Sequence, residues 1–79
     1  MPPISNPSDR VLARRRAIGH HIREARRAAN LTQEALAERA GVDRQAISII
    51  ENGHASPLLD TLLAIADGLD MPLADLVRE

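Results

Sequence analysis

The chain has 79 residues, a formal net charge of −1, no cysteine and no aromatic residue of the Phe, Tyr or Trp type. This length allows one domain with a small core and leaves no room for a catalytic or small-molecule ligand domain beside it. Without cysteine there are no disulfides or thiolate metal sites, and without aromatic rings single-stranded nucleic acid cannot be bound by base stacking. No apolar run can cross a membrane and no signal peptide is evident, so we expect a cytoplasmic protein with no membrane partner.

The net charge conceals an uneven distribution along the chain. Residues 1–54 carry nine arginines against six acids, whereas residues 55–79 carry one arginine against five acids. Phosphate binding depends on the local field and not on the total charge. The first two thirds of the chain can therefore face nucleic acid.

The N-terminal part predicts an arm followed by a long helix. Prolines and small polar residues over 1–9 are typical of a disordered arm, which leaves residues 10–79 as the folded domain. A first helix is expected from Asp9 to Ala29, because apolar residues recur there at helical spacing, at Val11, Ile18, Ile22, Ala25 and Ala29.

The next stretch, 31–53, predicts two short helices joined by a tight turn. The first is expected over Thr32–Ala40 with Thr32 as its N-cap, although Ala35 stands where a glutamate would complete a capping box. Gly41 suits the left-handed residue that ends a helix. The second is expected over Asp43–Asn52, capped by Asp43 and followed by Gly53.

This second short helix divides into two faces. Its apolar side carries Ala46, Ile47 and Ile50, and its other side carries Arg44, Gln45, Ser48, Ile49 and Asn52. Arginine and glutamine at the exposed start of such a helix fit guanine and adenine edges in a major groove. The pattern predicts a helix-turn-helix that reads DNA.

Two more helices are expected at the C-terminal end. The fourth should run from about Leu58 to Gly68, with Leu59, Leu62, Leu63, Ala66 and Leu69 as core or dimer contacts, and a short fifth should span Pro72–Val77. Gly68 falls inside the fourth helix and Asp70 stands where a glycine usually ends it, so we expect this end to fray.

These motifs together resemble a known family. LTQ at 31–33, Leu-Ala at 36–37, Gly-Val at 41–42 and I-x-x-I-E-N-G at 47–53 are similar to the phage repressor and Cro type of helix-turn-helix, also called the xenobiotic-response-element family. The similarity covers roughly residues 18–77. It implies an all-α, five-helix, lambda-repressor-like domain with the helix-turn-helix in helices two and three. We therefore expect a transcription regulator that reads a palindromic operator in double-stranded DNA as a homodimer, without a cofactor.

The residues expected to contact DNA are Thr32, Gln33, Asp43, Arg44, Gln45, Ser48, Ile49, Asn52 and His54. Arg44 and Gln45 are the expected base readers, and the resemblance assigns Gln33 to the DNA backbone. Ile49 fits either a thymine methyl group or a protein partner, and Asp43 either caps its helix or accepts from cytosine. The three histidines lack a shared ligand spacing, so no metal site is expected.

Two further sets of residues are assigned structural roles. The resemblance implies a buried ion pair between Arg26 and Glu51, and both residues do lie beside expected core positions. Leu63, Leu73, Leu76 and Val77 exceed the apolar residues that a small five-helix core needs. Because the C-terminal part is too acidic to face DNA, we expect helix five and the end of helix four to form a two-fold dimer interface.

Other functions remain to be weighed. An enzyme is disfavoured, because so small a helical bundle offers little water-excluding volume and Ser48 lies in mid-helix. A protein-interaction module without DNA reading is the rival from another class, and it would lack salt-sensitive DNA binding. Within the DNA-binding class, a free-standing repressor or activator, a restriction–modification controller and an antitoxin all stay open, and the flanking genes would separate them.

Overall fold

The computed structural model describes residues 7–79, so most of the expected N-terminal arm lies outside the described residues. Its elements are α1 (Asp9–Ala28), α2 (Gln33–Ala40), α3 (Arg44–Glu51), α4 (Leu59–Gly68) and α5 (Leu73–Val77). The five expected helices are present, and each bound lies within one residue of the expected one. Within residues 7–79, no helix is both long and apolar enough to cross a membrane.

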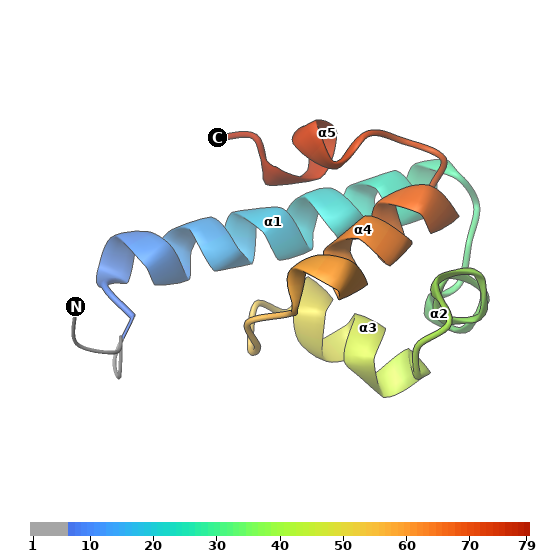
Figure 1. The fold of residues 1–79 in the computed structure, drawn as a ribbon, viewed down its shortest axis with the longest axis horizontal. Helices are drawn as coiled ribbons and strands as arrows, with labels where there is room; N and C mark the ends of the chain where they lie inside the picture. The colour runs from blue at the N-terminus through green and yellow to red at the C-terminus, as the bar shows by residue number, and fades with distance from the viewer. Residues whose placement is uncertain (1–6) are drawn as a thin grey trace.

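The helices are arranged around α1, which runs the length of the molecule. In Figure 1, α2 and α3 lie on one side of α1, α5 lies on the other side, and α4 crosses in front. Helix α1 packs against α3 and α5, while α2 packs against both α3 and α4. The helix-turn-helix is therefore supported from behind by α1 and α4.

The core draws side chains from all five helices. Its fully buried members are Ile22 of α1, Leu36 of α2, Ile47 of α3, Ile65 of α4 and Leu76 of α5. Because Leu76 has no exposed surface, its assignment to a dimer interface is wrong: together with Leu73 and Val77 it packs α5 against the core.

The ends of the first four helices share one closing motif. A residue with positive φ follows each of them: Asn30, Gly41, Gly53 and Asp70. After α4, Asp70 N–H donates to Asp67 and Met71 N–H donates to Ala66, which is the hydrogen-bond pair of a Schellman motif. The expected fraying of α4 is therefore not seen, and the left-handed position is filled by an aspartate.

The beginnings of the helices differ in how they are capped. The hydroxyl groups of Ser8 and Thr32 accept hydrogen bonds from the backbone N–H groups of Val11 and Ala35, at 3.1 and 3.0 Å. Asp43 occupies the N-cap position of α3, but its side chain makes no capping hydrogen bond, so that expected interaction is absent. Its carboxylate is exposed at the start of α3 instead.

Helices α1 and α3 approach each other closely at Gly19. A Cβ atom at this position would lie 2.7 Å from the carbonyl oxygen of Glu51, and it would also collide with the carbonyl of Ile50. Only glycine permits this distance between the two backbones. The contact fixes the C-terminal end of α3 against the middle of α1.

Candidate nucleic-acid interface

The outward side of α3 carries the residues that the sequence assigned to base reading. Arg44 and Gln45 are exposed in the first turn, and Ile49, one turn later, is 44% exposed. Ser48 lies between them and is half-buried. Ile47 and Ile50 on the opposite side are buried in the core, so the rotation of α3 about its axis is fixed by packing.

The remaining expected DNA contacts lie at both ends of the helix-turn-helix. Thr32 is exposed at the start of α2 and Gln33 beside it is half-buried, while Asn52 and His54 are exposed just beyond α3. Gln33 and Asn52 are brought together through Glu51 and Arg23, as the hydrogen bonds below show. Contacts with DNA by these residues stay predictions.

The carboxylate of Glu51 is the centre of a buried network. Arg26 donates to it twice, from Nε to Oε2 at 2.6 Å and from Nη2 to Oε1 at 3.1 Å. Gln33 Nε2 donates to the same Oε1 at 3.2 Å, and Arg23 Nε donates at 3.5 Å. The Glu51 side chain has no exposed surface. The ion pair that the resemblance implied is therefore present and joins α1 to α3, and the hydrogen bond from Gln33 adds α2.

The surroundings of the ion pair shift the pKa values of both Glu51 and Arg26. Burial alone would raise the pKa of Glu51, but hydrogen bonds from Arg26 and Gln33, together with the charge of Arg26, outweigh burial and lower that pKa. The hydrogen bond to Glu51 raises the pKa of Arg26, against the opposing effect of burial. Both groups are held in their charged forms, and Arg26 Nη1 also donates to the carbonyl oxygen of Leu31 at 2.8 Å.

Arg23 is a member of this site that the sequence did not single out. Its Nη2 donates to Asn52 Oδ1 at 2.8 Å, and Asn52 Nδ2 donates to the carbonyl oxygen of Ser48 at 2.9 Å. Asn52 therefore keeps one N–H for an outside partner. The spacing of three residues from Arg26 places Arg23 on the same face of α1, which was the available signal.

The residues assigned to the dimer interface do not share one surface. Leu63 is 43% exposed, but Leu73 and Val77 are half-buried against the core and Leu76 is fully buried. The most exposed leucines lie elsewhere, at Leu58 (75%) and Leu59 (61%). Helix α5 is mainly a core element, and the exposed apolar surface is at the start of α4.

Comparisons with known proteins agree with this arrangement. The helix-turn-helix family model matches residues 22–76. An uncharacterized HTH-type transcriptional regulator of Methanothermobacter thermautotrophicus is 52% identical over 48 residues, which are 61% of this chain and 70% of that protein.

Two solved structures have the same fold. The restriction–modification controller protein C.AhdI of Aeromonas hydrophila is 34% identical, with a TM-score of 0.80 over 81% of this chain and 97% of its own. The P22 c2 repressor, solved in complex with a synthetic operator, is 31% identical, with a TM-score of 0.73 over 77% of this chain and 92% of its own. The chain belongs to the phage-repressor or xenobiotic-response-element type of helix-turn-helix protein, and it is a DNA-binding transcription regulator of that family.

Proposed function

We propose that this protein is a repressor that binds a palindromic operator as a homodimer, with α3 of each protomer in the major groove. The observation that carries the proposal is the construction of α3. Its C-terminal end is buried and hydrogen-bonded to two other helices, while Arg44 and Gln45 at its other end are exposed. A rigidly held helix with free guanidinium and amide groups can form bidentate hydrogen bonds with guanine and adenine.

The charge distribution supports the same orientation. The helix-turn-helix and α1 lie in the basic part of the chain, whereas α4 and α5 lie in the acidic part. The exposed carboxylates of Asp60 and Asp67 on α4 and of Asp75 on α5 would be repelled by phosphates. The acidic helices therefore face away from the duplex, or towards another protein.

The test starts from a pool of random DNA duplexes, because the operator is not known. Selected sequences should converge on a palindrome with half-site centres about 34 Å apart, and affinity should fall steeply with salt. Wild-type protein that selects no sequence, and whose binding is insensitive to salt, would be a protein-interaction module and not a DNA reader.

A restriction–modification controller is the second candidate role within the same class. It is favoured by the similarity to C.AhdI, which covers nearly all of that chain. The genes beside the coding sequence separate the roles: a restriction endonuclease gene identifies a controller, and a toxin gene identifies an antitoxin. Either outcome keeps the DNA-binding function and changes only the genes that it controls.

A further inference from the structure

The guanidinium group of Arg23 lies between the buried network and the outside of the molecule. Its side chain is 30% exposed. It donates from Nε to Glu51 Oε1 at 3.5 Å and from Nη2 to Asn52 Oδ1 at 2.8 Å. A guanidinium has five N–H groups, so the other three have no partner among residues 7–79. Arg23 is therefore held from one side and can donate to a ligand on the other.

The network carries more positive than negative charge. Arg26 donates to both carboxylate oxygens of Glu51, at 2.6 and 3.1 Å, and the two charges balance each other. Arg23 reaches only one of these oxygens, at the longer distance of 3.5 Å, so its charge is not balanced by the same carboxylate. Because this surplus charge lies on the more exposed of the two arginines, a ligand at this point should be an anion.

The same guanidinium fixes the orientation of the Asn52 amide. An arginine can only donate and a backbone carbonyl can only accept. Asn52 must therefore turn Oδ1 towards Arg23 and Nδ2 towards the carbonyl oxygen of Ser48. The second N–H of Nδ2 is left for an outside partner, and Asn52 is exposed. Arg23 thus makes Asn52 a donor next to its own free N–H groups.

These donors lie at the end of the base-reading helix. Asn52 directly follows α3, whose eight residues make it about 12 Å long, and the major groove of DNA is also about 12 Å wide. With the first turn of α3 at the base edges, its C-terminal end comes to the rim of the groove, where the backbone runs. The anion that meets Arg23 and Asn52 there is a phosphate of the DNA backbone.

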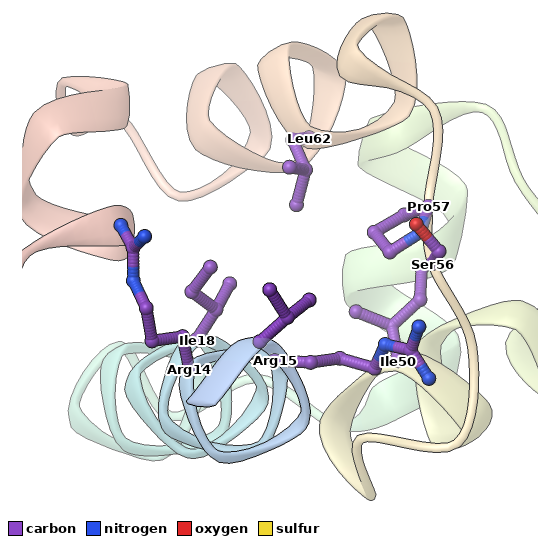
Figure 2. Close-up of a pocket in the computed structure, with 8 residues that line it drawn as sticks. Arg14, Arg15, Ile18, Ile50, Ser56, Pro57 and Leu62 are labelled. Atoms are coloured by element: carbon purple, nitrogen blue, oxygen red, sulfur yellow. The ribbon is translucent and has the colours of Figure 1, made fainter. Parts of the chain in front are cut away.

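Other arginines of α1 are placed differently. Arg10 and Arg14 pair with Glu79 at the opposite end of the chain, at 2.9 and 3.2 Å. Figure 2 shows the Arg14 side chain at the border of an apolar groove, pointing away from Ile50 of α3. Arg14 is therefore a suitable control: it carries the same charge on the same helix but does not lie at the end of α3.

We propose that Arg23 and Asn52 together bind one phosphate of the operator backbone, and that Arg23 also positions the Asn52 amide for this contact. The inference rests on the proposed binding of an operator and names a backbone contact of that site. Two side chains that are already hydrogen-bonded to each other lose little freedom when they bind, so the contact adds affinity at low cost. A phosphate contact fixes the register of the protein on the duplex and carries no base preference.

The first test compares Arg23→Met with the wild type on the selected operator over a range of salt concentrations. Methionine keeps an unbranched apolar side chain but has neither the charge nor the N–H groups. We expect affinity to fall about tenfold for each half-site. The slope of log affinity against log salt should become shallower by about 0.9 for each half-site, with the base preferences unchanged. Arg14→Met should alter neither affinity nor slope.

A second test replaces one operator phosphate at a time by an uncharged methylphosphonate, which separates a phosphate contact from a purely structural role. At one position in each half-site the neutral group should weaken binding by the wild type and by Arg14→Met. It should have no further effect on Arg23→Met or on Asn52→Ala, because the two side chains share that phosphate.

Unchanged salt dependence in Arg23→Met, or wild-type responses of that variant to every methylphosphonate, would overturn the proposal. Should Arg23→Met fail to fold, Asn52→Ala decides alone, since Asn52 is exposed and its truncation costs little stability. A wild-type protein that selects no DNA sequence overturns the proposed function and this contact with it. A selected palindrome that Arg23→Met binds like the wild type overturns only the contact and keeps the repressor.

Discussion

The C-terminal end of α3 is buried and hydrogen-bonded from α1 and α2, whereas the N-terminal end of the same helix is exposed and its cap makes no side-chain hydrogen bond. Glu51 at one end is held by three donor residues, while Arg44 and Gln45 at the other end are free to meet a ligand. The contrast shows how an eight-residue helix can be both stable and available for recognition. It also predicts that substitutions at the two ends affect different measurements.

The largest effect is expected from Arg26→Ala. Removing the guanidinium leaves the buried Glu51 carboxylate without its main partner, which should cost about 3–5 kcal/mol of unfolding free energy. Arg27→Ala is the matched control, because Arg27 is exposed on the same helix and should change stability little. Urea unfolding measures both. Equal stabilities, with a salt-dependent loss of DNA affinity in Arg26→Ala, would make Arg26 a phosphate contact instead.

Gly19→Ala tests the backbone contact that holds the same end of α3. The added methyl group would meet the carbonyl oxygen of Glu51, so the two helices must separate, at a cost of about 1–3 kcal/mol. His20→Ala, next along α1 and exposed, should leave the unfolding free energy close to that of the wild type. If Gly19→Ala unfolds at the wild-type urea concentration, α1 and α3 are not held at this distance in solution.

Substitutions at the exposed N-terminal end of α3 should lower the affinity for DNA and leave the unfolding free energy almost unchanged. Arg44→Ala and Gln45→Ala should each weaken binding to the selected operator by about 1–3 kcal/mol and relax the preference at one base pair. Their unfolding free energies should stay within about 0.5 kcal/mol of the wild type, since both side chains are exposed. Titrations against single-base operator variants measure the effect. Unchanged base profiles in both variants would mean that α3 is not the reader.

Lowering the pH should reduce the unfolding free energy by protonating Glu51 at the buried C-terminal end of α3. Because its pKa is lowered on folding, its contribution to stability is complete above the unfolded-state value, about 4.3 for an ordinary glutamate, and is lost as pH falls through the lower folded value. Unfolding free energy measured from pH 7 to pH 3 should therefore fall more steeply for the wild type than for Glu51→Gln. Parallel curves for the two proteins would show that Glu51 does not titrate as a stabilising group.

The sequence predicted local features better than contacts between helices. Helical spacing located all five helices, and the polar side of α3 was assigned correctly because packing fixes which side is buried. The pairing of Arg26 with Glu51 was implied only by the family resemblance, and Arg23 was overlooked, since spacing along α1 does not show what faces it. The approach at Gly19 was missed for the same reason.

The leucines of the C-terminal half show where sequence reasoning fails. Of the four residues expected to exceed the needs of the core, only Leu63 is exposed, whereas Leu73 and Val77 are half-buried and Leu76 is fully buried. Leu76 is buried because α5 packs against α1 and α4, whereas Leu59, in the first turn of α4, is exposed. The turn into α5 passes through Asp70, whose φ is positive although an aspartate stands where a glycine was expected.

Asp70 allows the smallest of the predicted effects to be tested. Its φ of +56° lies in the left-handed region, where a side chain is strained and glycine is not. Asp70→Gly should therefore raise the unfolding free energy by up to about 1 kcal/mol, because relief of backbone strain exceeds the added freedom of the unfolded chain.

Ala64→Gly in the middle of α4 is the matched control, and it should lower the unfolding free energy by about 1 kcal/mol or more. Neither change touches α3, so operator affinity should stay constant while stability moves in opposite directions. A loss of stability in both variants would mean that the Asp70 side chain stabilises the turn by more than its backbone strain costs.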